Sequence, residues 1–230
     1  DLAQVASGPT LPDRSDRAAA RKLVEAWRIT LPPRIASWLA EDKDLPPSPD
    51  DPHFAGHKVH VIASARLSIE AAAQKAAATG ISPVILSDSI EGEARDVGAV
   101  HAAIAREVAL RSRPFGKPVV ILSGGETTVT LRGQGRGGRN SEFLLALALA
   151  AEGISFAALA ADTDGIDGSE NNAGAFASGD TATRLRSLGQ DPRSLLMAND
   201  SYSAFERLGD LFVPGPTGTN VNDFRAILLR

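Results

Sequence analysis

The chain has 230 residues, of which 43% are hydrophobic and 23% charged, as in an ordinary globular protein. Its formal net charge of -4 and its pI of about 5.6 argue against a nucleic-acid-binding or membrane-binding surface. The absence of cysteine excludes disulfides and thiolate metal sites and fits a cytoplasmic protein. The longest apolar run, Phe143 to Ala151, is too short to cross a bilayer.

The first part of the chain predicts two helices and a linker. Residues 1–16 are rich in turn formers, and Ser15 is expected to cap a helix that runs to about Thr30. A second, short helix is expected from Pro33 to Ala40. The charged and proline-rich segment at residues 42–58 is typical of a linker.

After this segment, apolar runs alternate with helical patterns. Buried strands are predicted at residues 59–64, 83–88, 118–124, 154–162 and 224–229. Helices are predicted at residues 67–79, 93–111, 141–152, 181–188 and 201–208, the third of them capped by Asn140. This alternation predicts a three-layer α/β fold in which helices flank a mostly parallel or mixed sheet.

The mixed alternative rests on residues 127–132. Their polar and apolar side chains alternate, which predicts a half-exposed strand. They follow the strand at residues 118–124 too closely for a parallel crossover, so some antiparallel pairing is expected.

Polar residues gather where the predicted strands end, at Ser64, Ser87–Asp88, Ser123–Gly125 and Asp162–Asp164. In open α/β sheets, ligands bind beyond the carboxyl ends of the strands. We therefore expect a binding site along this edge.

A glycine-rich loop lies between a predicted strand and a predicted helix. Gly133, Gly135 and Gly138 match the spacing G-x-G-x-x-G, and Arg136 and Arg139 lie in the same loop. Glycine lets the backbone approach a phosphate, and a helix N-terminus offers free N–H groups. The loop predicts an anion site, and the alternative is a turn with solvated arginines.

Three acids, Asp162, Asp164 and Asp167, follow a predicted strand closely. Such carboxylates repel one another unless a cation, a base or a proton offsets them. Their pattern indicates a Mg²⁺ site, and the alternative is a solvent-exposed turn.

The long polar segment at residues 214–223 is typical of a binding loop, although an ordinary connection is the alternative. Other patterns carry no prediction. His53 and His57 lack the glutamate of a zinc protease, and neither a Walker A motif nor a G-x-S-x-G elbow occurs.

Four segments together resemble the glycerate 2-kinase family, also called MOFRL, some bacterial members of which carry the label hydroxypyruvate reductase. They are SGPTLPD at residues 7–13, SGGETTVTLRGQGRGGRNSE at 123–142, TDGIDG at 163–168 and NDSYSAFERLGDLFVPGPTGTNVND at 199–223. The sequence departs from the family at Ser141, where glutamine is common, and at residues 64–66, where asparagine is commoner.

The resemblance implies two α/β domains with an active site in the cleft between them. Residues 1–52 are expected to be the tail of an N-terminal domain plus a linker, and residues 58–230 the C-terminal domain. The rest of that N-terminal domain is then a partner that this sequence lacks. The implied reaction is ATP-dependent phosphorylation of D-glycerate to 2-phosphoglycerate with Mg²⁺ or another divalent cation.

The resemblance also assigns residues to roles. Catalytic roles are expected for Arg136, Arg139, Glu126 and Asp162, and metal binding for Asp164 and Asp167. Nucleotide or substrate contacts are expected from Ser123, Gly124, Gly125, Gly135, Gly137, Gly138, Asn140, Thr217, Gly218, Thr219, Asn220 and Asn222. The general base is not identified among these residues, and the N-terminal part is one candidate source.

Two other classes of function stay open. A strand, G-x-G-x-x-G, a helix and a strand ending in Asp162 approach a dinucleotide fingerprint, which would suit an NAD(P)H-dependent hydroxypyruvate reductase. A non-catalytic fragment that binds an anion or a partner is the second alternative. The arginines of the loop and the aspartates after Asp162 favour a triphosphate with Mg²⁺ over NAD. The protein is expected to bind a small hydroxy acid, no nucleic acid and no membrane, and to form a homodimer.

Overall fold

The computed structural model describes residues 11–12, 14, 16–41 and 47–230. The predicted loop over residues 1–10, the cap at Ser15 and residues 42–46 of the linker lie outside the described residues. The chain divides into two units, Asp1–His60 and Val61–Arg230.

The described part of the first unit is helical. It contains α1 (Arg17–Ala26), α2 (Pro33–Ala40) and a short 3-10 helix, η2 (Pro52–Phe54). The side chain of Asp16 caps α1 by accepting a 2.7 Å hydrogen bond from the Ala19 N–H. The first helix, expected to reach about Thr30, ends four residues earlier, at Ala26. The second helix has the expected bounds.

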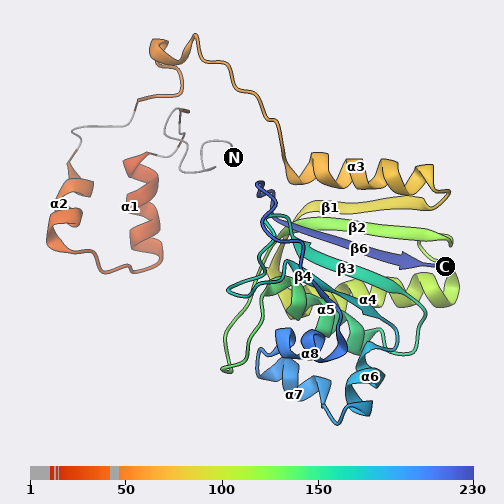
Figure 1. The fold of residues 1–230 in the computed structure, drawn as a ribbon. Helices are drawn as coiled ribbons and strands as arrows, with labels where there is room; N and C mark the ends of the chain where they lie inside the picture. Colours follow the sequence, from red (N-terminus) through yellow and green to blue (C-terminus); the bar gives the residue numbers. More distant parts are fainter. Residues whose placement is uncertain (1–10, 13, 15, 42–46) are drawn as a thin grey trace. The chain divides into compact units, whose positions relative to one another are not determined.

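The second unit is built on one mixed sheet of six strands in the order β1-β2-β6-β3-β4-β5 (Figure 1). The strands are β1 (Ser82–Glu93), β2 (Val119–Thr128), β3 (Ala157–Asp162), β4 (Gly174–Ser178), β5 (Leu211–Phe212) and β6 (Asp223–Leu229). Only β1 and β2 pair in parallel, and every other pair is antiparallel. The mixed form of the prediction is confirmed, and a mostly parallel sheet is wrong.

The position of β6 accounts for this difference. The last strand of the chain inserts between β2 and β3 and runs antiparallel to both. In this register Asp223, the first residue of β6, lies opposite Gly125 of β2 and Asp162 of β3. The carboxyl ends of β2 and β3 therefore meet the start of β6 at one edge of the sheet.

Helices cover the two faces of the sheet unequally. α3 (Ala65–Ala78) lies on one face, and the other carries α4 (Ala94–Arg111), α5 (Arg139–Ala150), α6 (Thr181–Ser187), α7 (Pro192–Met197) and α8 (Ser201–Leu208) (Figure 1). The main core lies on the side of α5, where Phe143, Leu144 and Leu147 are fully buried. A smaller cluster under α3 contains Ile69, Val120 and Leu122. α5 is apolar on most sides because other elements surround it.

Three predicted elements differ from the structure. Residues 59–64 form no strand and pair with none in the described part of the chain. Ile62, expected to be buried, is 92% exposed. Residues 127–132 are not a separate strand, since β2 continues through the glycines to Thr128. Finally, α5 begins at Arg139 with Gly138 at its N-cap, two residues earlier than an Asn140 cap would place it.

Candidate active site

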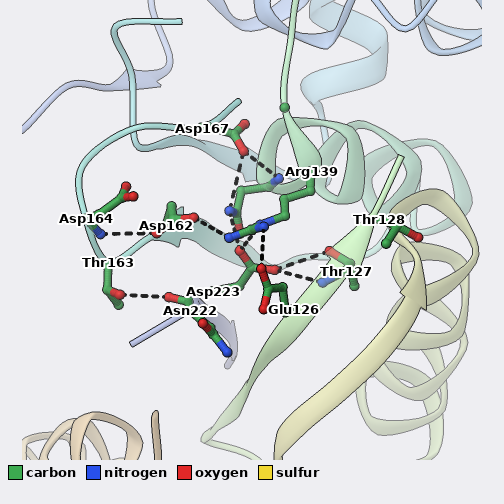
Figure 2. A network of polar contacts seen from close by, with 12 residues as sticks. Glu126, Thr127, Thr128, Arg139, Asp162, Thr163, Asp164, Asp167, Asn222 and Asp223 are labelled. Carbon is green, nitrogen blue, oxygen red and sulfur yellow. Dashed lines mark hydrogen bonds and ion pairs between the residues drawn. The ribbon is translucent and has the colours of Figure 1, made fainter. Parts of the chain in front are cut away.

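The candidate site lies where β2 and β3 end and β6 begins (Figure 2). β2 contributes Glu126 and Thr127, β3 ends in Asp162, α5 starts with Arg139, and β6 starts with Asp223. These residues come together because the antiparallel β6 starts where its two neighbours finish.

Arg139 is at the centre of the site. Its Nε donates to Asp223 at 2.7 Å, its Nη2 to Asp162 at 2.5 Å, and its Nη1 to Glu126 at 3.2 Å. Burial lowers the pKa of Arg139, but the carboxylates, led by Asp223, outweigh this effect and raise its pKa above the usual range. The guanidinium is therefore charged and held in one plane by acceptors on three sides.

Asp223, to which the sequence analysis assigned no role, accepts several hydrogen bonds that fix Arg139 and its neighbours. One carboxylate oxygen accepts from Arg139 Nε and from Asn140 Nδ2 at 2.8 Å. The other accepts from the N–H and hydroxyl of Thr127, both at 3.2 Å, and from Arg225 Nη2 at 2.6 Å. With 2% exposure, this carboxylate is a buried junction between two arginines.

Arg225 is fully buried, and its guanidinium lies 5.1 Å from the ring centre of Phe143. Its Nη2 also donates to the Thr127 hydroxyl at 3.1 Å, whereas its Nε and Nη1 have no hydrogen-bond partner. Burial lowers the pKa of Arg225, although Asp223 acts against this effect. The sequence carried a signal for the Asp223–Arg225 pair, because residues two positions apart in a buried strand lie on the same face.

Asp162 has a perturbed environment of its own. Its side chain is 6% exposed and accepts from the Asp164 N–H at 3.1 Å as well as from Arg139. Burial raises the pKa of Asp162, while the Asp164 N–H and Arg139 oppose the rise.

Asp167, which was predicted as a metal ligand, caps α5 in this structure. Its oxygens accept from the N–H groups of Asn140 and Ser141, both at 2.9 Å, and from the Ser141 hydroxyl at 2.7 Å. Burial raises the pKa of Asp167, and the hydrogen bond from Ser141 is the largest effect that lowers it. The helix N-terminus that was expected to bind a ligand anion therefore already holds a protein carboxylate.

The glycine-rich loop packs against the turn between α7 and α8. Asn199 Oδ1 accepts from the N–H groups of Arg132 at 2.7 Å and Gly133 at 3.0 Å, and Gly135 N–H donates to the Ala198 carbonyl at 2.9 Å. A Cβ on Gly135 would lie 2.4 Å from that of Asp200. This glycine allows close packing, and its N–H is not free to cradle a phosphate, contrary to the prediction.

Glu142 holds the same turn, and the sequence analysis missed it. Its buried carboxylate accepts from Arg95 Nε at 2.8 Å and from Asn199 Nδ2 at 2.9 Å. Since Asn199 binds the loop, this network fixes the loop to α4 and α5.

Arg136 was predicted to be catalytic, but it points elsewhere. Its side chain is 52% exposed, pairs with Glu170 at 2.8 Å and lies 4.1 Å from the ring centre of Tyr202. It does not line the cavity that contains Arg139.

The Ser-Gly-Gly stretch in β2 also has a packing role. Ser123 is 1% exposed, and its hydroxyl lies 2.9 Å from Nε2 of His101. A Cβ on Gly124 would lie 2.8 Å from Ile69 Cδ1, and Gly125 has φ +133° with the β1 backbone against it. These three residues shape the strand and do not line the cavity.

The polar loop at residues 214–222 folds over the turn that follows β3. Thr217 hydroxyl donates to the Thr163 carbonyl at 2.5 Å, and Asn220 Nδ2 donates to Asp164 at 3.3 Å. The Asn222 carbonyl accepts from the Thr163 N–H and hydroxyl, at 3.2 and 2.8 Å. Of the loop's predicted contact residues, Asn220 lines the cavity.

A cavity of about 650 Å³ opens at this edge. Its lining includes Glu126, Thr128, Leu131, Gly137, Gly138, Arg139, Asp162, Asp164 and Asn220. A hollow of about 720 Å³ lies at the opposite ends of β1 and β2, beside Lys117 and Arg230, but it contains no carboxylate. Size alone therefore does not locate the site, and the polar network does.

The residues present fit a hard divalent cation. Among the described residues, the Asp164 carboxylate accepts from Ile166 N–H at 2.8 Å and from Asn220 Nδ2 at 3.3 Å, which leaves oxygen lone pairs for a cation at the cavity that it lines. Within the described residues, no group of three or more acidic or histidine side chains could hold a metal by itself. This donor set suits Mg²⁺, which binds through one or two carboxylates together with water and substrate phosphates.

Comparison with known proteins identifies the family. A model of the MOFRL family matches residues 119–223, the stretch from β2 to Asp223. The D-glycerate 2-kinase of Thermotoga maritima is 37% identical over 220 residues, which are 95% of this chain and 51% of that protein. The chain belongs to the MOFRL family.

Other relatives carry a different name. An Agrobacterium vitis protein named "Putative hydroxypyruvate reductase" is 46% identical over 232 residues, 100% of this chain and 52% of that protein. The chain thus spans about half the length of the curated MOFRL proteins it matches.

The MOFRL fold is confirmed by a solved structure. The crystal structure of the Thermotoga maritima glycerate kinase superimposes with a TM-score of 0.87 at 36% identity, covering 100% of this chain and 54% of that one. In the described part of the chain, no helix combines the length and apolar character needed to span a membrane.

Proposed function

We propose that the full-length protein phosphorylates D-glycerate with ATP and Mg²⁺ and releases 2-phosphoglycerate. The observation that carries the proposal is Arg139, a fixed cation in the wall of an otherwise acidic cavity. Glycerate kinases among the relatives support the choice of reaction.

Phosphoryl transfer requires mainly positioning and neutralisation of charge. Glu126 makes the longest of the three bonds to Arg139, 3.2 Å, and its side chain is 57% exposed. An oxygen of the phosphoryl group or of the glycerate carboxylate would replace Glu126 at Nη1. Asp223 and Asp162 would keep the guanidinium plane fixed during this exchange.

Asp164, with Asp162 or Glu126, would hold Mg²⁺ at the same cavity. When bound, the cation would neutralise phosphate charge that a single arginine leaves unbalanced. Gly137, Gly138 and Asn220 would shape the space for the donor and acceptor.

The proposal includes two domains. Residues 1–52 would belong with a preceding α/β domain, and residues 58–230 would form the domain that carries the described half of an interdomain site. The length of the relatives supports this division. A cytoplasmic location and a homodimer stay predictions.

The second candidate is a hydroxypyruvate reductase, which the names of the Agrobacterium vitis relatives favour. A dinucleotide site would need the N-terminus of α5 for the pyrophosphate. Because Asp167 already occupies that N-terminus, the geometry favours the kinase. The same contact argues against the other alternative, a non-catalytic fragment that binds an anion at the glycine-rich loop.

Assays of the full-length protein with ATP, MgCl₂ and D-glycerate, and separately with NADH and hydroxypyruvate, test the proposal. We expect a phosphorus NMR doublet, because the phosphate of 2-phosphoglycerate is bonded to a CH group. A triplet would indicate transfer to the terminal hydroxyl, and NADH oxidation without phosphoryl transfer would establish the reductase instead.

A further inference from the structure

The face of the sheet that carries α3 is only partly covered. α3 packs on β1, β2 and β6, whereas the same face of β3, β4 and β5 stays open in the second unit. Phe176 of β4 is 46% exposed there, and its ring packs edge-to-face on Phe212 of β5 at 5.5 Å.

A hollow of about 310 Å³ lies on this face, between the first turns of α3 and the loop at residues 214–221. Its walls are apolar and partly aromatic, from Leu159, Ala161, Phe212, Pro214, Val221 and Phe224. Ser68, Thr163, Thr217 and Thr219 also line it, and the hydroxyls of Thr163 and Thr217 are bonded to backbone carbonyls. This lining suits a flat heterocycle that carries a hydroxylated sugar.

The hollow adjoins the candidate active site. Asp162 lines both this hollow and the cavity that contains Arg139. Thr163 and Thr217 lie on the hollow side of the same turn, whereas Asp164 and Asn220 lie on the cavity side. A ligand with an apolar head and an anionic chain could therefore occupy both spaces by passing over residues 162–164.

We propose that this hollow holds the base and ribose of a nucleoside triphosphate, whose phosphates pass over the turn after β3 to Arg139. The inference rests on the proposed kinase function and identifies the part of the fold that binds the donor. Stacking on Phe212 and contact with Leu159 supply the affinity for the base, and Ser68 and Thr219 offer hydroxyl groups to the ribose.

Three variants of the full-length protein test the assignment. Leu159→Trp fills the hollow, Phe212→Ala removes its aromatic wall, and Leu110→Ala, which truncates an exposed apolar side chain of α4 outside the lining, is the control. ATP affinity is measured by calorimetry without glycerate, and KM is measured for ATP, tripolyphosphate and D-glycerate.

We expect the first two variants to weaken ATP binding about tenfold or more, since loss of an aromatic stacking partner has an effect of this size. The KM for D-glycerate and any turnover with tripolyphosphate should stay unchanged, and the control should bind ATP normally. Unchanged ATP affinity in both variants, or equal losses for ATP and tripolyphosphate, would overturn the assignment. So would lower melting temperatures with normal ATP affinity, which would identify the face as one covered by protein.

Photolabelling of the wild-type protein with 8-azido-ATP gives a test that needs no variant. Labelled peptides from residues 211–224 are expected, and labels confined to other segments would contradict the proposal. The calorimetry and labelling do not depend on turnover. A wild-type protein that binds ATP in the hollow but fails to phosphorylate glycerate would refute the proposed reaction and leave this site intact.

Discussion

At the scale of single residues, the site depends on how Arg139 is held. Each of its three guanidinium nitrogens, Nε, Nη1 and Nη2, donates to a different carboxylate. Behind it, Asp223 is shared with the buried Arg225. The Arg139 guanidinium is thus oriented by a second ion pair, Asp223–Arg225, whose side chains are fully buried.

Replacing Arg139 with alanine or lysine should strongly reduce turnover, because lysine cannot make three divergent hydrogen bonds. Loss of a preorganised cation at the transition state should cost about 2–4 kcal/mol, or roughly 30- to 1,000-fold in kcat. The matched control is Arg136→Ala, which removes an arginine from the same loop but outside the cavity. Steady-state kinetics and melting curves provide the measurement, and equal losses in Arg139→Lys and Arg136→Ala would contradict the distinction.

Arg225→Met should lower both stability and kcat with little change in KM. The buried Asp223 carboxylate then keeps Arg139 but loses its second charged partner, and removing one partner of a buried pair costs about 3–5 kcal/mol. The double variant Arg225→Met/Asp223→Asn should recover much of the stability but not the turnover, because Asp223 no longer orients Arg139. Recovery of both quantities would show that the pair serves only the fold.

At the scale of elements, α5 organises the glycine-rich loop and the acidic turn. Its first residue is Arg139, and its N-terminal N–H groups bind Asp167 from the turn after β3. The loop before it is tied to the turn between α7 and α8 through Asn199 and Asp200. Together these contacts hold the start of α5, and therefore Arg139, at the edge of the sheet.

Asp167→Ala and Asp164→Asn should have opposite profiles. Loss of the cap by Asp167 should lower the free energy of unfolding by about 1–2 kcal/mol, with the Mg²⁺ dependence of activity unchanged. Asp164→Asn should increase the Mg²⁺ concentration needed for half-maximal activity while leaving stability nearly unaffected. Metal titrations and chemical denaturation of both variants check this, and a changed metal requirement in Asp167→Ala would restore its assignment as a ligand.

The contact between α4 and β2 should make stability depend on pH. His101 is 3% exposed, its Nδ1 donates to the Val97 carbonyl at 2.8 Å, and its neutral Nε2 accepts from the Ser123 hydroxyl. Burial lowers the pKa of His101 below 6.5. The unfolded chain therefore binds this proton more readily, so stability is complete above pH 6.5 and falls below it, by at most about 1.4 kcal/mol per pH unit.

His101→Gln tests this contribution through urea denaturation between pH 5 and 7. The variant should lose less stability than the wild type as the pH falls, since glutamine binds no proton. Parallel curves for the two proteins would show that His101 does not titrate in this window.

At the scale of the whole molecule, the sheet edge where β2, β3 and β6 meet carries a mostly acidic cavity. Glu126, Asp162 and Asp164 line the cavity, and Arg139 is the only arginine or lysine in the lining that the structure describes. A triphosphate and a carboxylate substrate would need more positive charge than this edge offers. A divalent cation and groups from the other half of the full-length protein would have to supply it.

The 230-residue chain by itself should therefore unfold cooperatively but turn over glycerate at less than about 1% of the full-length rate, a loss of nearly 3 kcal/mol in transition-state stabilisation. Assays of both proteins at equal concentration, with saturating Mg²⁺, provide the comparison. Comparable rates would refute a site shared between two domains.

Much of this description could be predicted from local patterns. Helical periodicity and apolar runs located α2, α4, α5 and most strands of the sheet, because these signals depend on near neighbours in the chain. The short strands β4 and β5 were missed, since β4 owes its conformation to pairing with β3, and β5 to pairing with β4, and not to their own composition. The motifs were also sufficient to assign the family, and three of the residues they singled out, Arg139, Asp162 and Asp164, line one cavity.

Only the tertiary structure separated the residues that face the cavity from those that support it. Arg136 and Arg139 are three positions apart in one loop, yet one pairs at the surface and the other with three carboxylates. Asp167 looked equivalent to Asp164 until the N-terminus of α5 was placed beside it. The reason is that the partners of these side chains come from distant segments, and the insertion of β6 between β2 and β3 decides which of them meet.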